Sequence, residues 1–167
     1  MLPKITVGIT GHRDIVQTEA LQEEIRAFFS DLLERYQEVV LLSPLASGAD
    51  QWTADLFLSY AKEGKILRLV VPLPLGLETY EREFDAEGLH RFRQLLDVAD
   101  EVFELDVSAD DPYRVLGEYV VDHSDIVLAL WDGTYNHMAG GTGDVVSYAK
   151  TEKRPLKHLK VSRLSRA

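Results

Sequence analysis

The sequence predicts an α/β protein built on a mainly parallel β-sheet with helices on both faces. Segments typical of strands and helices alternate along all 167 residues, and 46% of the residues are hydrophobic. The expected strands are short runs of apolar residues rather than alternating patterns, which indicates burial on both faces of a parallel sheet. Three turns of small or glycine residues follow expected strand ends. Together these features predict one domain covering residues 1–167.

The first part of the chain supplies three strands and two helices. The first helix begins near Thr18 and places apolar residues at helical spacing as far as Tyr36. The second helix is expected to stop at Gly64, because glycine commonly ends helices. The strands are expected over residues 4–10, 39–42 and 66–71.

The second part of the chain continues the alternation after an irregular segment. Two prolines in residues 72–76 remove backbone donors and fix φ, so regular structure is not expected there. A helix is predicted from about Tyr80 to Ala99, weakened by Gly88 inside it. The remaining elements are a strand over 101–105, a helix over 113–124, a strand over 126–131, a helix from 144 to 149 and a last strand over 156–161. This order is typical of a Rossmann-like, doubly wound fold, in which ligands bind at the carboxyl ends of the strands.

Composition excludes several classes of function. The chain has no cysteine, which excludes disulfides, thiolate nucleophiles and cysteine metal sites, and nothing demands a metal or cofactor. No apolar run reaches the length of a membrane span and no signal peptide is evident, so a cytoplasmic protein with no membrane contact is expected. A net charge of −10 argues against nucleic acid as a partner. Basic residues concentrate in residues 150–167, which are interpreted as a last strand with a solvated tail. The alternatives are that this basic tail packs on the acidic body or binds an acidic partner.

The first of the three turns contains Gly11, His12 and Arg13. A glycine at a strand end followed by arginine permits close approach to a phosphate and a bidentate grip on it. Arg13 could instead pair with Asp14 or another acid. His12 could serve as a base or contact a phosphate, although a lone histidine is more often simply hydrogen-bonded.

The second turn is Ser47-Gly48-Ala49-Asp50, at the start of the second helix. Small residues would let the helix N-terminus face a ligand, and the Ser47 hydroxyl could donate to it. Asp50 suits the first turn of a helix on dipole grounds, and it could also accept a hydrogen bond from a ribose hydroxyl.

The third turn, Gly140-Gly141-Thr142-Gly143, leads into the helix that starts with Asp144. Unpaired backbone N–H groups and the positive end of the helix dipole form a site for phosphate there. The turn lacks the pattern of the dinucleotide fingerprint and of the P-loop. Asp132, just after the preceding strand, could bind a hydroxyl, a base edge or a metal, or form an ordinary turn with Gly133.

Several motifs resemble the SLOG superfamily, a group of Rossmann-like domains that includes DprA/Smf and the Lonely Guy phosphoribohydrolases. They lie at residues 8–14 (GITGHRD), 43–50 (SPLASGAD), 71–74 (VPLP) and 123–146, the last with Gly-Gly-Thr-Gly-Asp-Val-Val, and the resemblance extends from Ile5 to about Ala149. The resemblance implies a nucleotide or nucleotide-derived ligand, with its phosphate on Gly140 to Gly143 and the other two turns closing the site.

The chain departs from the hydrolase pattern Pro-Gly-Gly-x-Gly-Thr-x-x-Glu. Ala139 replaces the proline, Asp144 the threonine and Ser147 the glutamate that takes part in glycosidic cleavage. Serine cannot supply that carboxylate, so Asp144 and Asp132 are the candidates for catalysis. We expect a sensor-type nucleotide-binding domain; the alternatives are a nucleotide N-glycosidase or related sugar-transfer enzyme, and a purely structural partner-binding domain. The resemblance also implies a homo-oligomer, with Tyr113 and Tyr135 suited to an interface.

Overall fold

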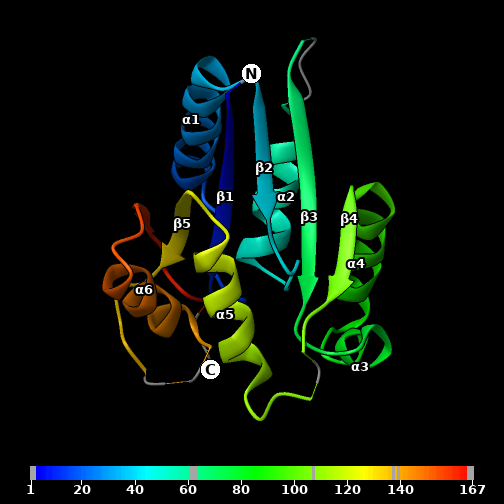
Figure 1. The fold of residues 1–167 in the computed structure, drawn as a ribbon. Helices are drawn as coiled ribbons and strands as arrows, with labels where there is room; N and C mark the ends of the chain where they lie inside the picture. Colours follow the sequence, from blue (N-terminus) through cyan, green and yellow to red (C-terminus); the bar gives the residue numbers. More distant parts are fainter. Residues whose placement is uncertain (1–2, 61–63, 107, 137, 139, 165–167) are drawn as a thin grey trace.

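A computed structural model of the chain has a six-stranded, all-parallel sheet in the order β4-β3-β2-β1-β5-β6 (Figure 1). The structure describes residues 3–60, 64–106, 108–136, 138 and 140–164. The strands are β1 (Lys4–Gly11), β2 (Glu38–Leu42), β3 (Ile66–Leu73), β4 (Glu101–Glu104), β5 (Ile126–Trp131) and β6 (Leu156–Lys160). Successive strands run outward from β1 to β4, and the chain then returns to place β5 on the other side of β1. The Rossmann-like, doubly wound fold is confirmed, and the order reverses between β1 and β5.

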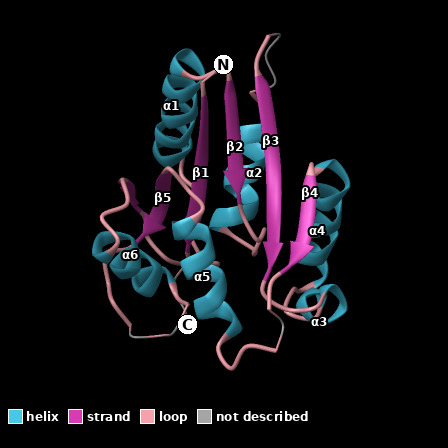
Figure 2. Ribbon diagram, viewed as in Figure 1, coloured by secondary structure: helices cyan, strands magenta, loops and turns pink. Residues whose placement is uncertain are grey.

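Helices cover both faces of the sheet (Figure 2). They are α1 (Glu19–Arg35), α2 (Ala49–Leu58), α3 (Leu77–Glu81), α4 (Ala86–Val98), α5 (Pro112–Asp122) and α6 (Thr142–Thr151). Helix α2 packs against α1 and α4 on one face, whereas α5 and α6 pack together over β1 on the other. No helix in the described part of the chain is long and apolar enough to cross a bilayer.

The predicted interruption at the prolines begins later than expected, because β3 continues through Pro72 to Leu73. Val70 O accepts a bond from Ser43 N on the β2 side, and Leu73 O accepts one from Leu105 N on the β4 side. Alternation along the strand directs the nitrogen of Pro72 toward β2, whose pairing with β3 ends at Val70. The pairing between β2 and β3 thus ends at the point where Pro72 has no N–H to donate.

The single helix predicted over residues 80–99 is wrong, because two helices fill this region. Helix α3 ends at Glu81, and α4 starts after Asp85, whose Oδ1 accepts a 2.7 Å hydrogen bond from Gly88 N. An aspartate N-cap satisfies an orphan amide of the first turn, so the break occurs at the cap rather than at the glycine. Helix α2 also ends earlier than predicted, at Leu58, while Gly64 has a positive φ of 80°.

The C-terminal segment is docked on the body rather than being only a solvated tail. After β6, Val161 is buried, and Ser162 O accepts a 2.8 Å hydrogen bond from Val16 N. Arg163 forms an antiparallel bridge with Ile15, which follows β1. This packing places residues 161–164 beside the carboxyl end of β1.

Candidate functional site

A cavity of about 480 Å³ opens at the carboxyl ends of the strands, where the strand order reverses. Its wall includes residues from all three predicted turns. These residues are Gly11, His12, Arg13, Asp50, Gly140, Gly141 and Thr142. The predicted site residues Ser47, Gly48, Ala49, Asp132, Gly143 and Asp144 do not line it.

His12 is a buried, structurally bonded histidine on the cavity wall. Its Nε2 lies 3.2 Å from the backbone N of Asp132, which donates to it, and 3.3 Å from Asp132 Oδ1. Burial lowers the pKa of His12, the nearby Arg163 guanidinium lowers it further, and Asp132 opposes both. The neutral imidazole of His12 accepts a hydrogen bond from the Asp132 amide and so links the loops after β1 and β5.

Arg13 lines the cavity, and its guanidinium lies 6.0 Å from the centroid of the Tyr113 ring. Within the described residues, no carboxylate lies within 4.0 Å of this guanidinium, and Asp14 pairs with Arg163 instead. The structure therefore contradicts the interpretation in which Arg13 forms an ion pair with Asp14. A cation held beside an aromatic ring, with no carboxylate neutralising it, is suited to bind an anionic ligand.

The second turn packs against the first turn, and only its last residue, Asp50, lines the cavity. A Cβ added at Gly48, where φ is +82°, would lie 2.2 Å from the carbonyl oxygen of Arg13. Ala49 N donates a 3.1 Å hydrogen bond to His12 O, and the Ser47 hydroxyl lies against Gly88. The small residues thus let the loop after β2 pack closely on the loop after β1.

Asp50 is the residue of this turn that reaches the cavity. Its side chain is almost fully buried, with 5% exposed, and its Oδ2 accepts a 3.3 Å hydrogen bond from Ala46 N. Burial raises the pKa of Asp50 to about 7, although the Ala46 N–H and the charge of Arg13 act in the opposite direction. A buried carboxyl group that titrates near neutrality in a cavity is typical of functional sites.

The loop between β2 and α2 holds a strained residue beside Asp50. Leu45 is fully buried with a positive φ of 59°, a conformation that costs about 1 kcal/mol or more for a non-glycine residue. Gln51 Nε2 donates to Leu45 O at 3.2 Å and to Gly88 O at 3.0 Å. The buried amide fixes the strained loop to α4, which sets the position of Asp50.

The third turn presents the N-terminus of α6 to the cavity. Two of its amides are already used, because Gly140 N donates to Asp144 Oδ2 at 2.9 Å and Gly141 N donates to Met138 O at 3.0 Å. The next two amides, of Thr142 and Gly143, have no acceptor among the described residues. Of these two residues only Thr142 lines the cavity, so the anion-binding capacity of the turn toward the cavity belongs to the start of α6.

The two candidate catalytic carboxylates lie outside the cavity wall. Asp144 lines an adjoining cavity of about 220 Å³ between α5 and α6, which shares Gly140 with the large one, and its Oδ2 is 3.9 Å from Arg114 Nε. Ser147 lines the same small cavity. Asp132 Oδ1 accepts a 2.9 Å hydrogen bond from Thr134 N, in a turn that includes Gly133 with φ +91°. Burial would raise the pKa of Asp132, but this hydrogen bond and His12 lower it instead.

The predicted site residues account for only part of the cavity wall. Among the wall residues that the sequence analysis did not assign to the site are Tyr80, Glu83, Tyr113 and Arg163. Tyr113 was expected at an exposed interface, yet it is half-buried, and burial and the Glu83 charge raise its pKa while Arg13 lowers it. Tyr80 is buried and donates a 3.0 Å hydrogen bond to Pro44 O. For Tyr80 and Tyr113, the available signal was an aromatic side chain in a helix that follows the end of a strand.

The arrangement combines an apolar wall with a charged rim. Tyr113, Leu116 and Val120 of α5 supply a face on which a planar ring could lie, and Arg13 and the α6 N-terminus supply donors for an anion. Asp50 supplies an acceptor for a hydroxyl or amino group. These are the groups that a nucleotide requires.

No model of a known protein family matches the chain. The chain is similar to the uncharacterized SPbeta prophage-derived protein YoqJ of Bacillus subtilis, at 23% identity over 145 residues that span 78% of this chain and 80% of the relative. This similarity extends over most of both chains. It assigns neither a family nor an activity.

Proposed function

We propose that the protein binds a nucleotide or nucleotide-derived ligand and acts as a sensor rather than as an enzyme. The observation that carries the proposal is the shared cavity of the three turns at the reversal of strand order, with Arg13 and the N-terminus of α6 on its wall. Ligands of doubly wound sheets bind at this position. The phosphate would lie on the first turn of α6 within reach of Arg13, and the base against Tyr113 and its apolar neighbours.

A nucleotide N-glycosidase or phosphoribohydrolase is the alternative. It is favoured by one observation, a buried carboxyl group at Asp50 with its pKa raised to about 7, which suits general acid–base work near neutral pH. It is disfavoured by the position of the other carboxylates. Asp144 and Ser147, the residue at the glutamate position of the hydrolases that the sequence resembles, both line the smaller cavity.

A thermal-shift screen tests the proposal. The protein is heated with nucleoside mono-, di- and triphosphates, cyclic nucleotides, NAD and ADP-ribose, and the release of free base is assayed in every well. A ligand at a hundred times its dissociation constant is expected to stabilise the fold by about 2.7 kcal/mol, a shift of several degrees. A shift without free base supports a sensor, and a shift with free base supports the enzyme. No shift with any compound contradicts both.

We propose further that the protein works in the cytoplasm, from its lack of cysteine, and as a homo-oligomer. Tyr135 is 44% exposed and remains available to an interface, whereas Tyr113 belongs to the cavity wall. Light scattering coupled to size-exclusion chromatography distinguishes a dimer or larger assembly from an 18.9 kDa monomer. A single species at the monomer mass would contradict the oligomer.

A further inference from the structure

The C-terminal segment contributes a side chain to the cavity wall through Arg163. Two backbone hydrogen bonds hold the segment on the loop after β1: Val16 N donates to Ser162 O at 2.8 Å, and Leu164 N donates to Asp14 O at 2.7 Å. The burial of Val161 fixes the segment at its start. Arg163 therefore reaches the cavity from a defined backbone position.

The guanidinium of Arg163 is oriented by Asp14. Its Nε donates a 2.8 Å hydrogen bond to Asp14 Oδ1. In the described part of the chain this is the hydrogen bond that the guanidinium makes, so Nη1 and Nη2 remain for a ligand. The planar guanidinium suits two parallel bonds to a phosphoryl group.

The two arginines of the cavity wall serve different ends of it. Arg163 is bonded to Asp14 and bridged to Ile15 in the loop after β1, close enough to act on His12, whose Nε2 meets the loop after β5. The charge of Arg13 acts on Asp50 and on Tyr113, beside the glycine-rich turn. A cavity of about 480 Å³ is large enough for a ligand that spans both ends.

We infer that Arg163 is a ligand-contacting residue and that the cavity takes a nucleotide with two separate phosphoryl groups. One group lies at the N-terminus of α6 with Arg13, and the other lies at the His12 end with Arg163. The inference depends on the proposed nucleotide-binding function and adds the class of ligand to it. It also gives the C-terminal segment a role in recognition.

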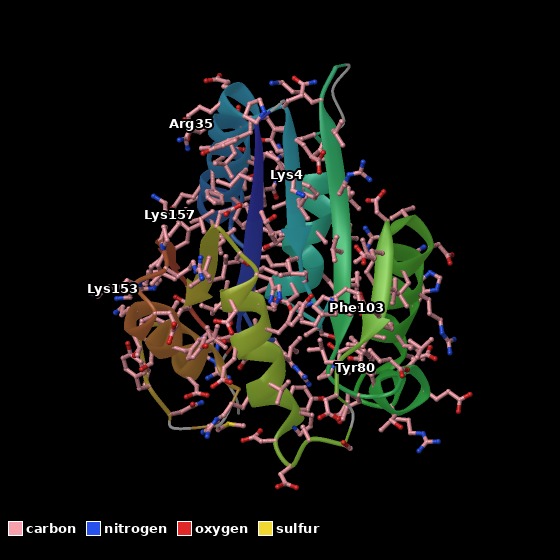
Figure 3. All side chains as sticks on the ribbon, in the orientation of Figure 1. Lys4, Arg35, Tyr80, Phe103, Lys153 and Lys157 are labelled. Carbon is pink, nitrogen blue, oxygen red and sulfur yellow. The ribbon has the colours of Figure 1, made fainter. Side chains whose placement is uncertain are left out.

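Isothermal titration with the 5′-monophosphates, 5′-diphosphates and 3′,5′-bisphosphates of adenosine, guanosine, cytidine and uridine tests the inference. For at least one base, we expect the wild-type protein to bind the bisphosphate about 10- to 100-fold more tightly than the monophosphate, as one charge-assisted contact would give. Arg163→Ala is expected to remove this advantage and to leave the monophosphate affinity unchanged. Lys157→Ala is the matched control: it removes one positive charge from an exposed residue of β6 outside the cavity, labelled in Figure 3.

The other possible outcomes of these titrations show whether the inference alone is wrong or the proposed function as well. A bisphosphate advantage that persists in Arg163→Ala, or a full advantage with the 5′-diphosphates, overturns the inference while nucleotide binding stands. Failure of every nucleotide to bind the wild-type protein overturns the proposed function together with the inference.

Arg163→Gln separates ligand contact from docking of the segment, because glutamine can still donate to Asp14 but carries no charge. Hydrogen exchange at the Val16 amide reports whether the segment stays docked. A protected Val16 amide with the bisphosphate advantage lost supports direct contact. A full advantage in the Gln variant would mean that Arg163 only positions the loop, which overturns the inference.

Discussion

Arg13 is the residue on which the proposed binding of a single phosphate is expected to depend most. Its guanidinium has no carboxylate partner within 4.0 Å among the described residues and lies over Tyr113, so a ligand phosphate would replace no internal ion pair. Arg13→Ala is expected to weaken the best nucleotide of the thermal-shift screen by about 1.5–3 kcal/mol, or about 10- to 100-fold, in calorimetry.

Arg35→Ala provides the control for that measurement. Arg35 is exposed at the end of α1, at the opposite end of the sheet from the cavity, and is labelled in Figure 3. Its loss is expected to leave the affinity unchanged. Equal affinities of the Arg13 variant and the wild-type protein would remove Arg13 from the site.

The raised pKa of Asp50 predicts an unusual dependence of the protein's stability on pH. Its pKa is raised from 3.8 to about 7 in the folded protein, so between these values the unfolded chain ionises first. The contribution of Asp50 to stability is thus greatest at pH 4 or below and is lost as the pH rises to about 7. Asp50→Asn should be more stable than the wild-type protein at pH 8, by as much as about 4 kcal/mol, with the difference vanishing near pH 4.

Urea denaturation at pH 4, 6 and 8 measures this difference. Asp31→Asn, which changes an exposed carboxylate of α1 paired with Arg35, is the control for loss of a charge. A difference for Asp50→Asn that does not change with pH would mean that the Asp50 carboxyl has an ordinary pKa.

At the scale of single residues, the sequence predicted which turns approach the cavity but not which atoms face it. Small residues such as Gly48 were predicted to admit a ligand, whereas in the structure they admit the backbone of the neighbouring loop. Contact with a ligand and contact with a neighbouring backbone both require a residue without a bulky side chain, so the sequence alone does not separate the two roles. Arg163 lay beyond prediction, because its position depends on an antiparallel contact with Ile15, far away in the sequence.

At the scale of elements, the glycine-rich turn before α6 owes its shape to packing as well as to conformation. Gly140 has φ +74°, and an added Cβ would lie 2.5 Å from the backbone of Tyr113; Gly133 has φ +91° with nothing within 4 Å. Alanine at Gly133 pays only the conformational cost, about 1–2 kcal/mol. Alanine at Gly140 has the same conformational cost and must also displace α5. The loss in unfolding free energy should therefore be clearly larger for Gly140→Ala than for Gly133→Ala.

Urea denaturation of both variants, followed by nucleotide titration, checks this prediction. Gly140→Ala is expected to weaken binding because Tyr113 moves, whereas Gly133→Ala is expected to bind like the wild-type protein. Equal destabilisation by the two substitutions would show that the contact with Tyr113 does not constrain the turn.

The strands and most helices could be predicted because burial on both faces leaves continuous apolar runs, such as Ile126–Trp131. The errors occurred where local signals conflict with tertiary packing. Pro72 ends a regular segment in most settings, but here it lies where the pairing with β2 has already stopped. The break before α4 depended on Asp85 as a cap, a signal that is present in the sequence but that the prediction from helical spacing did not use.

At the scale of the whole molecule, the parallel topology is what brings the three turns together. The turns that follow β1, β2 and β5 are spread over residues 11–143 of the sequence, yet parallel strands place all three at one edge of the sheet (Figure 1). The sequence could predict this juxtaposition from the alternation of strands and helices alone. It could not predict that the end of the chain would return to the same edge.

The charge distribution leads to a prediction for the whole molecule: the protein binds nucleotides but not nucleic acid. The net charge is −10, and the basic residues of the last segment are partly committed, since Arg163 pairs with Asp14 at the cavity. A nucleic acid strand needs a continuous basic surface for its successive phosphates, whereas a nucleotide needs only the charges that line one cavity. Fluorescence anisotropy with a labelled 30-nucleotide single strand at 150 mM salt should therefore show no saturable binding up to about 100 μM protein, the upper end of the usual range of non-specific dissociation constants. Binding at micromolar protein that weakens steeply with salt would mean that the basic C-terminal residues act as a surface of their own, independent of the acidic body.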